Sequence, residues 1–269
     1  MRVALTIAGS DSGGGAGIQA DLRTFGAHRL HGTSAITAVT AQNSVAVTAW
    51  VALEPAMVVA QMEAVATDMP VAATKTGMLA TEAIIRSVAE AAGRLRLGPM
   101  VVDPVMVAKS GDRLLDAGAQ RAYLEVLFPR ATLVTPNLYE AEALLGRAIP
   151  DEAAMRIAAR DLVALGARAV LLKGGRLPGR ALDVFCDGDR LVDLPAERID
   201  TRHTQGTGCT LSAAIAARLA LGEPLLEAVR GAKAWLTDAL RGAYTVGQGR
   251  GPVDHLGTPV DRPGPPVRG

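Results

Sequence analysis

Short apolar runs alternate with amphipathic helical stretches, which predicts an α/β fold with a doubly wound, mostly parallel sheet covered by helices on both faces. The apolar runs are continuous rather than alternating in polarity, as expected of strands that are buried on both sides. The chain has 269 residues, of which 49% are hydrophobic and only 3% aromatic. It can therefore bury a large core of Ala, Val, Leu and Ile within one unit.

The elements follow one another in a regular order. Six apolar runs are predicted to be the parallel strands: Val3–Ala8, Ser34–Ala41, Val71–Thr76, Met100–Val102, Leu133–Val134 and Ala169–Leu172. Four intervening stretches carry residues at helical spacing: Ile18, Leu22 and Phe25; Met57, Gln61 and Val65; Ile84, Val88 and Ala92; Leu124 and Leu127. We expect an edge strand or small hairpin at Val45–Val51, and a second hairpin of Ala181–Phe185 and Leu191–Leu194 around an Asp-Gly turn.

The chain shows no internal repeat and no linker, so we expect one domain over residues 1–256 and a flexible, Gly/Pro-rich tail over 257–269. The net charge of +1 argues against nucleic acid or an acidic membrane as a partner. No stretch has the form of a secretory leader or approaches the ~18 apolar residues of a membrane span. The two cysteines, Cys186 and Cys209, form no CxxC motif, and we expect a reducing cytoplasm.

Polar and glycine residues follow the predicted strands at their carboxyl ends. In an open parallel sheet these ends share one edge, and ligands bind in the crevice beside it. One such strand end alone would indicate no more than contact with solvent. Because six strands end in this way, we predict a ligand site along that edge, formed by Gly9-Ser10-Asp11, Gln42-Asn43, Gly77-Met78, Asp103-Pro104, Pro136-Asn137 and Lys173-Gly174-Gly175.

The stretch Thr204–Ser212 is predicted to be an anion site at the start of a helix. Gly206, Thr207 and Gly208 precede a segment with helical spacing, and a glycine-rich helix start exposes unpaired N–H groups at the positive end of the helix dipole. Cys209 lies in this first turn, where the pKa of a thiol is generally lowered. We interpret Cys209 as a base that accepts the proton of a substrate alcohol during attack on a phosphorus.

A second glycine cluster, Gly13–Gly17, stands between the first strand and the first helix. It fits a dinucleotide fingerprint poorly, because the second strand ends in Gln42 rather than an acid, and no Walker A sequence is present. We expect a loop whose backbone lies against a ligand. Asp21 in the following helix is either a partner of the helix dipole or a hydrogen-bond acceptor for a bound small molecule.

Three further side chains suggest phosphate and metal chemistry. Asp103 and Glu140 are carboxylates near neighbouring strand ends, and magnesium uses carboxylates together with water and phosphate oxygens. Asn137 with Glu140 also fits a helix-capping arrangement, and the two interpretations are compatible. Lys173 is followed by two glycines, so its ammonium could reach a phosphate unobstructed.

These motifs together resemble the hydroxymethylpyrimidine/phosphomethylpyrimidine kinases of thiamine biosynthesis, within the ribokinase-like superfamily. The resemblance runs in one order over about residues 1–256 and is therefore highly specific. The matching segments are Ala8–Asp11, Gly14–Asp21, Thr40–Asn43, Lys75–Met78, Val102–Gly111, Thr135–Asn137, Leu172–Gly175 and Gly206–Ser212. The resemblance implies an enzyme, usually a homodimer, that uses ATP and magnesium. It would phosphorylate 4-amino-5-hydroxymethyl-2-methylpyrimidine and then the resulting monophosphate.

The resemblance also implies roles for individual residues. The residues that would face the pyrimidine are Gln42, Asp21, Gly9, Met78 and Val105. The residues that would bind ATP are Lys173, Asn137 and Gln205. Asp103 and Glu140 would hold magnesium. Gly206, Thr207 and Gly208 would form the anion hole. Cys209 would take the place of the aspartate base of most ribokinase relatives.

Two positions differ from the usual pattern of that family. Gln205 stands where the family usually has His, so a contact to phosphate that could carry charge becomes neutral. Ser12 stands where a Pro is usual, and we expect a looser first loop. Either change could alter which of the two phosphorylation steps is faster.

Three other functions stay open at this point. A pyridoxal or pyridoxine kinase of the same superfamily would take a substrate of similar shape, although Cys209 argues against it. A non-catalytic pyrimidine sensor would have no use for Lys173 and Asp103. A dinucleotide-dependent oxidoreductase would need an acid after the second strand.

Overall fold

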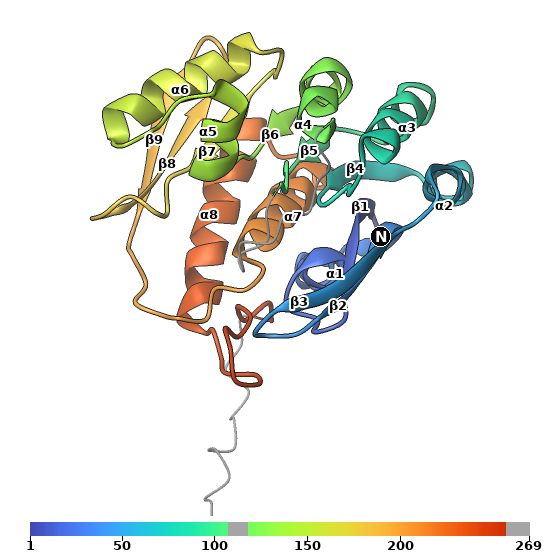
Figure 1. Ribbon diagram of the computed structural model, residues 1–269, viewed down its shortest axis with the longest axis horizontal. Coiled ribbons are helices and arrows are strands. Elements are labelled where there is room, and N and C mark those ends of the chain that lie inside the picture. The colour runs from blue at the N-terminus through green and yellow to red at the C-terminus, as the bar shows by residue number, and fades with distance from the viewer. Residues whose placement is uncertain (107–117, 257–269) are drawn as a thin grey trace, which may run out of the picture.

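The computed structural model describes residues 1–106 and 118–256 of the chain. The described strands form a nine-stranded sheet in the order β3-β2-β1-β4-β5-β6-β7-β8-β9 (Figure 1). The strands from β2 to β7 are parallel, and β3, β8 and β9 are antiparallel to their neighbours. Residues 107–111 of the matching segment Val102–Gly111 and the predicted tail at 257–269 lie outside the described residues.

The predicted strands are present with small differences at their ends. Their bounds are β1 Val3–Asp11, β2 His31–Gln42, β3 Val47–Ala52, β4 Val71–Thr76, β5 Met100–Val102, β6 Leu133–Val134, β7 Val170–Lys173, β8 Ala181–Cys186 and β9 Leu191–Ala196. The expected edge strand is β3, and the expected hairpin is β8 with β9. Strand β1 continues beyond Ala8 because its pairing with β2 resumes after a register shift between Ala8 and Ser10.

The helices lie between these strands. Their bounds are α1 Gly17–Ala27, α2 Pro55–Asp68, α3 Glu82–Arg94, α4 Ala119–Ala122, α5 Leu138–Leu145, α6 Glu152–Ala164, α7 Thr207–Ala220 and α8 Leu225–Arg241. A π-helical turn, Tyr123–Leu127, and a 3-10 turn, Phe128–Arg130, continue α4. Among the described residues, none of these helices has the length and apolar character needed to cross a membrane.

The predicted buried face of α2 is wrong by one position. Met57 is 53% exposed, whereas the next residue, Val58, and Met62 are fully buried. Helix α2 is apolar almost all round, so its periodicity alone does not indicate which side faces the sheet.

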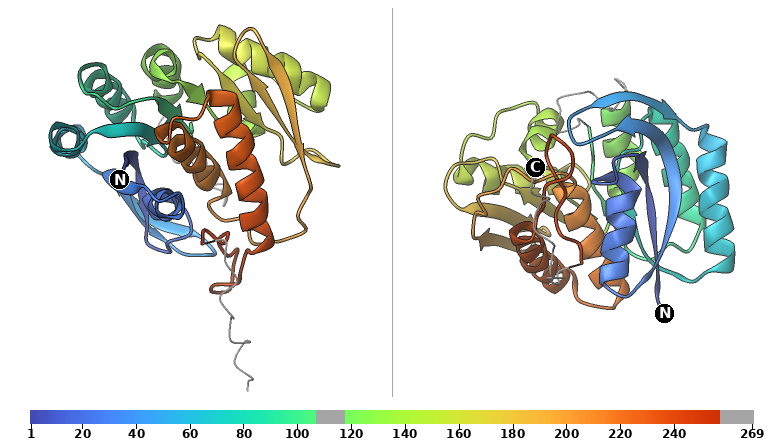
Figure 2. Two further views of the ribbon diagram at one scale, coloured as in Figure 1. Left: turned by 180° about the vertical axis from the view of Figure 1, so that it is seen from behind. Right: turned by 90° about the horizontal axis from the view of Figure 1, so that it is seen from below.

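Helices cover both faces of the sheet, as predicted (Figure 2). Side chains of α2 to α6 pack in one core, which includes Leu5 and Ile7 of β1. Side chains of α1, α7 and α8 pack in a second core, which includes Ala4 of β1. Successive residues of a strand point to opposite faces, so β1 contributes to both cores.

The order of the strands reverses at β1. From β1 the chain proceeds outward to β2 on one side, and later returns to add β4 on the other. Such a switch point leaves a crevice at the carboxyl ends of the two central strands, because the helices that follow them lie on opposite faces. The fold therefore positions a ligand site above β1 and β4.

One buried ion pair joins the last helix to the sheet. The Nζ of Lys233 on α8 lies 2.6 Å from Oδ2 of Asp183 on β8 and also donates to the carbonyl of Ala181. The other carboxylate oxygen of Asp183 accepts the N–H of Gly174, at 3.0 Å. Helix α8 is thereby linked to the loop that follows Lys173.

Removing the cation of this pair should destabilise the fold. In Lys233→Met the Asp183 carboxylate stays buried without its partner, and we expect a loss of about 3–5 kcal/mol in the free energy of unfolding by urea. The double variant Lys233→Met/Asp183→Asn should lose less. Arg230 on the same helix forms an exposed pair with Glu227, so Arg230→Met is the control and should cost at most about 1 kcal/mol. Equal losses of unfolding free energy in Lys233→Met and Arg230→Met would contradict a structural role for the buried pair.

Candidate active site

A cavity of about 170 Å³ lies at the carboxyl ends of the parallel strands, as the strand ends predicted. It is lined by Ala8, Gly9, Ser10, Asp11, Ala16, Gly17, Thr40, Gln42, Lys75, Met78, Asp103, Val105, Asn137, Glu140, Lys173, Gln205, Gly206, Gly208 and Cys209. The residues to which the sequence assigned individual roles are therefore gathered there, except Asp21 and Thr207. Of the predicted strand ends, the lining does not include Asn43, Gly77, Pro104, Pro136, Gly174 and Gly175. Thr207 is the first residue of α7, and its hydroxyl donates to the carbonyl of Thr204.

Helix α7 begins at the cavity with the geometry of an anion site. Gly206 precedes the helix with a φ of 72°, a left-handed conformation that favours glycine. Among the described residues, the N–H groups of Gly208 and Cys209 have no protein acceptor. These N–H groups and the positive end of the helix dipole are therefore available to a phosphate.

A lysine and an aspartate meet beside this helix start. The Nζ of Lys173 lies 2.8 Å from Oδ1 of Asp103. The Asp103 carboxylate also accepts from the hydroxyls of Thr135, at 3.2 Å, and Ser212, at 3.4 Å. A Cβ added to Gly208 would lie 3.4 Å from the Lys173 ammonium, so a positive charge stands next to the exposed N–H groups.

Glu140 has the capping role that the sequence indicated. Its Oε2 accepts the N–H of Asn137 at 2.7 Å, and Asn137 Oδ1 accepts the N–H of Glu140 at 3.1 Å. Burial raises the pKa of Glu140 to about 7, against the lowering effect of the Lys173 ammonium. At neutral pH a second cation near Glu140 would thus favour its ionised form.

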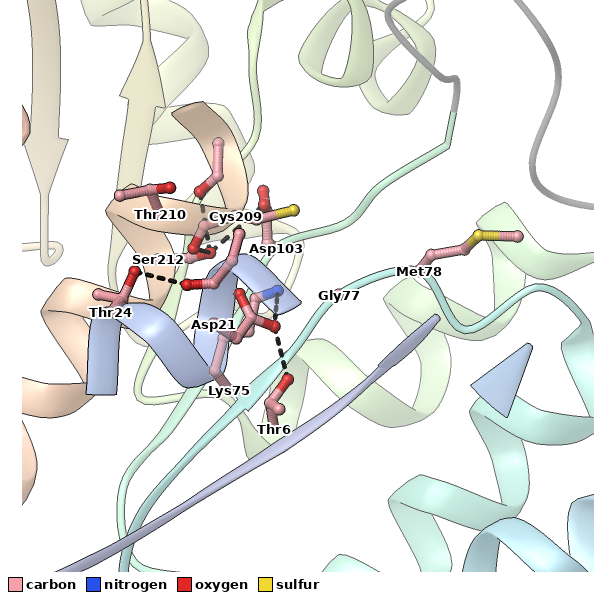
Figure 3. Close-up of polar contacts among 12 residues, drawn as sticks. Thr6, Asp21, Thr24, Lys75, Gly77, Met78, Asp103, Cys209, Thr210 and Ser212 are labelled. Atoms are coloured by element: carbon pink, nitrogen blue, oxygen red, sulfur yellow. Dashed lines mark hydrogen bonds and ion pairs between the residues drawn. The ribbon is translucent and has the colours of Figure 1, made fainter. Parts of the chain in front are cut away.

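Asp21 lies beneath the cavity rather than in its wall. Its side chain is fully buried, and Oδ2 accepts from Lys75 Nζ at 2.8 Å and from the hydroxyl of Thr6 at 2.6 Å (Figure 3). Lys75 is the member of the pair that lines the cavity. Among the described residues Oδ1 of Asp21 has no hydrogen-bond partner, and the structure places Asp21 behind Lys75 rather than in the cavity wall, where a direct ligand contact was expected.

The expectation of a lowered pKa for Cys209 is wrong in this structure. Burial raises the pKa of the Cys209 thiol, and the ammonium of Lys75 offsets only part of that effect. A helix start lowers the pKa of a thiol that solvent can reach, but loss of solvent penalises the thiolate more strongly here. The free protein accordingly keeps Cys209 largely protonated at neutral pH.

Another part of the cavity wall is formed by Gly9, Met78, Val105 and Gln42. A Cβ at Gly9 would come within 3.3 Å of the Met78 sulfur, so glycine leaves space for the methionine wall. The side-chain amide of Gln42 accepts from Thr40 Oγ1 at 3.3 Å. An amide beside an apolar wall suits a flat heterocycle that both donates and accepts hydrogen bonds.

Lys75 was not predicted as a site residue, and Asp11 was predicted only as a member of the row of strand ends, without a role of its own. Lys75 is fully buried in β4, and a lysine inside an apolar strand is itself a signal of a buried partner. Asp11 ends β1 in the predicted row of strand ends. Its contacts with the backbone of the following loop cannot be inferred from spacing.

The donor groups in the cavity fit a magnesium ion that phosphates help to bind. In the described part of the chain, no three His, Cys, Asp or Glu side chains cluster as a complete protein site. Magnesium commonly takes one or two carboxylates together with water and phosphate oxygens. Asp103 and Glu140, both in the cavity wall, supply that number of carboxylates.

Comparison with known proteins agrees with this geometry. The sequence model of the family described as phosphomethylpyrimidine kinase matches residues 11–254. The chain belongs to the phosphomethylpyrimidine kinase family. It is 56% identical over 259 residues to the hydroxymethylpyrimidine/phosphomethylpyrimidine kinase of Rhizobium meliloti, covering 94% of this chain and 97% of that one. The enzyme of the same description from Synechococcus elongatus is 51% identical, with coverages of 95% and 98%.

Solved structures confirm the ribokinase-like fold of this family member. The phosphomethylpyrimidine kinase of Clostridium difficile is 40% identical, with a TM-score of 0.79, covering 89% of this chain and all of that one. An ADP complex of Bacillus subtilis pyridoxal kinase is 39% identical, with a TM-score of 0.87 and coverages of 95% and 97%. The fold alone therefore does not separate pyrimidine kinases from pyridoxal kinases.

A histidine behind the helix start should make stability depend on pH. His255 is buried, and its Nε2 lies 3.0 Å from the hydroxyl of Thr210 on α7. Burial lowers the pKa of His255 to about 4, from an ordinary value of 6.5. Between pH 6.5 and pH 4 the unfolded chain is protonated at His255 while the folded chain is not. The contribution of His255 to the free energy of unfolding is therefore fully present above pH 6.5 and is lost as the pH falls toward 4.

Urea unfolding should show this loss directly. Between pH 7 and pH 5 we expect His255 to account for a fall of about 2 kcal/mol in the free energy of unfolding, and His255→Gln to lack that part of the fall. His31 is exposed, so His31→Gln is the matched control. A wild-type slope retained in His255→Gln would contradict the assignment.

Proposed function

We propose that the protein transfers the γ-phosphoryl group of ATP to the hydroxyl of 4-amino-5-hydroxymethyl-2-methylpyrimidine, and then a second phosphoryl group to the monophosphate. The observation that carries this proposal is the arrangement of one cavity, in which Gln42 and Met78 form one end and Lys173 lies beside the start of α7 at the other. Family membership and the names of the relatives, one of which is a bifunctional protein of thiamine biosynthesis, support the same reaction in that pathway.

The phosphate end would bind the nucleotide by charge and by backbone N–H groups. Lys173, with Asn137 and Gln205, would contact ATP, while the N–H groups around Gly208 would stabilise negative charge on the transferred phosphoryl group. Asp103 and Glu140 would hold magnesium, which neutralises phosphate charge when it is bound. The raised pKa of Glu140 is consistent with a carboxylate placed to meet a cation.

Cys209, in the first turn of α7, also lines the cavity and would receive the proton of the alcohol. As the hydroxyl oxygen bonds to the γ-phosphorus and the bond to ADP breaks, the hydroxyl proton passes to the Cys209 sulfur. Reaction through this route requires the thiolate, which burial disfavours and which the nearby Lys75 ammonium favours only in part. In the second step the attacking phosphate oxygen is already largely an anion, since its second pKa is about 6.

A pyridoxal kinase is the second candidate. Its support is specific, because a pyridoxal kinase structure at 39% identity covers 95% of this chain with a TM-score of 0.87. Relatives at 56%, 51% and 46% identity are described as hydroxymethylpyrimidine/phosphomethylpyrimidine kinases, which favours the pyrimidine substrate. The shapes of the two substrates are close enough that one assay should offer both.

The proposal extends to assembly and location. A homodimer follows from the family resemblance, and the outer hairpin of β2 and β3 exposes apolar side chains, with Val45 at 63% and Val51 at 64%. A reducing cytoplasm fits the two free cysteines, Cys186 and Cys209.

The substrate assignment can be tested by turnover. ATP consumption should be measured with the aminopyrimidine alcohol, its monophosphate and pyridoxine offered in turn to the purified protein. We expect turnover of the first two, with kcat/KM for the alcohol at least about tenfold above that for pyridoxine, because one unmade contact in the cavity costs on the order of 1–3 kcal/mol. No turnover of any of the three would refute the kinase proposal, and a preference for pyridoxine would select the second candidate.

The role of Cys209 predicts a difference between the two steps. Cys209→Ala should slow transfer to the alcohol by about 10²–10⁴-fold, the usual contribution of a general base, and slow transfer to the monophosphate much less. Rapid-quench measurement of each step with its own substrate would separate them. The control is Cys186→Ala, which removes the other, buried thiol of the chain. Equal slowing of the two steps by Cys209→Ala would rule out a base specific to the alcohol.

A further inference from the structure

The carboxylate of Asp11 joins two loops that are far apart in the sequence. Its Oδ1 accepts the N–H of Gly13 at 2.8 Å, and its Oδ2 accepts those of Gly15 at 3.0 Å and Ala16 at 2.8 Å. The Nε2 of Gln205 also donates to Oδ2, at 3.2 Å. Asp11 is only 2% exposed, so these four donors are its surroundings. The first glycine loop and the turn before α7 therefore share one buried charge.

The same two segments also touch through their backbones. A Cβ at Gly15 would lie 2.5 Å from the Gln205 side-chain carbon, and a Cβ at Gly206 would lie 1.9 Å from the carbonyl oxygen of Gly15. Position 206 requires glycine because the close atom belongs to the backbone, whereas at position 15 the close atoms belong to the flexible Gln205 side chain. The residue that starts the anion hole thus rests directly on the loop that follows β1.

Ser12 connects this contact to the pyrimidine end of the cavity. Its hydroxyl donates to the carbonyl of Gln42 at 2.7 Å and accepts the N–H of Gln42 at 2.8 Å. The Ser12 hydroxyl therefore forms two hydrogen bonds to the backbone of Gln42, contrary to the expectation of a looser loop. The backbone of Gln42 is hydrogen-bonded to Ser12, which follows Asp11 in the chain. Asp11 is in turn hydrogen-bonded to Gln205, which precedes Gly206.

Gln205 is not positioned as a side chain that is wholly free to contact a phosphate. Its backbone N–H donates to the carbonyl of Gly251 at 3.1 Å, and its side chain is directed to Asp11. The backbone N–H and one of the two Nε2 hydrogens of Gln205 are thus engaged within the protein. The amide carries no charge, so the bond to the Asp11 carboxylate does not depend on protonation of residue 205.

We propose that Ser12, Asp11 and Gln205 form a positioning network that sets the distance between the pyrimidine end and the anion hole. The proposal rests on the proposed function and deepens it. Gln205 acts through Asp11 and Gly206, and Ser12 acts through the backbone of Gln42. Loosening either side shifts both ends of the cavity, so binding of the heterocycle and phosphoryl transfer change together. Small displacements of a reacting atom are sufficient for a large loss of rate.

The network predicts that its members are not independent. Ser12→Ala and Gln205→Ala should each raise KM for the aminopyrimidine and lower kcat, with kcat/KM reduced on the order of tenfold. The double variant should be no more than about twofold worse than the worse single variant, because residues in one network are non-additive. Gln205→Glu sets a carboxylate against Asp11 and should reduce kcat/KM more than Gln205→Ala does. Ser12→Thr keeps the hydroxyl and should restore most of the activity.

Thr48 provides a matched control for Ser12. Its hydroxyl donates to the carbonyl of Ala41, next to Gln42, from the exposed strand β3 and outside the network. Thr48→Ala should leave KM and kcat within about twofold of wild type. A melting temperature for each variant establishes that it is folded before its kinetics are compared.

Calorimetric binding of the aminopyrimidine without ATP separates this proposal from the proposed function. The Kd values of wild type, the two single variants and the double variant should show the same non-additivity, whether or not the protein turns over ATP. Losses that simply multiply in the double variant would overturn the network, as would a Gln205→Ala variant with unchanged Kd and KM. A wild-type protein that binds the aminopyrimidine without phosphorylating it would refute the proposed function alone.

Discussion

The wholly buried ion pair of Asp21 and Lys75 is the constraint on which the site depends. Each charge would be strongly unfavourable alone in this position, so each requires the other. The pair joins α1 to β4, and Thr6 of β1 adds a hydrogen bond to the same carboxylate oxygen. It lies at the switch point of the sheet, where β1 and β4 are neighbours. The two central strands are thus held together directly below the cavity.

This pair also determines the electrostatics above it. Lys75 presents its ammonium toward the cavity that contains Cys209, and Lys173 adds a second ammonium near the start of α7. Asp103 and Glu140 partly balance these charges. The cavity combines fixed cations, unpaired N–H groups and two carboxylates in a partly desolvated space. Such a set favours the binding of a highly charged anion such as a phosphate.

The fold was largely predictable from the sequence because strands buried on both faces form continuous apolar runs. The positions of β4, β5 and β6 follow from such runs alone. The gathering of Gly9, Asp103 and Lys173 in one cavity follows from the shared edge of parallel strands. These predictions needed no knowledge of side-chain contacts.

Contacts between distant residues were not predictable in this way. Lys75 and Asp21 are 54 positions apart, and no spacing rule identifies them as partners. The pKa of Cys209 depends on its degree of burial, which a motif does not contain. The role of Ser12 was misjudged for the same reason, since its hydroxyl finds both of its partners in a strand 30 positions away. Pairings of this kind become visible only with coordinates.

The backbone contact between Gly15 and Gly206 has a consequence for how this chain can diverge. Any side chain at position 206 would occupy the space of the Gly15 carbonyl, and any side chain at position 15 would displace Gln205. A side chain at position 206 cannot be accommodated by a change at position 15, because the atom it meets belongs to the backbone and position 15 already holds the smallest residue. Drift among descendants of this sequence must therefore leave Gly206 in place, whereas a change at position 15 needs the Gln205 side chain to move or to be replaced.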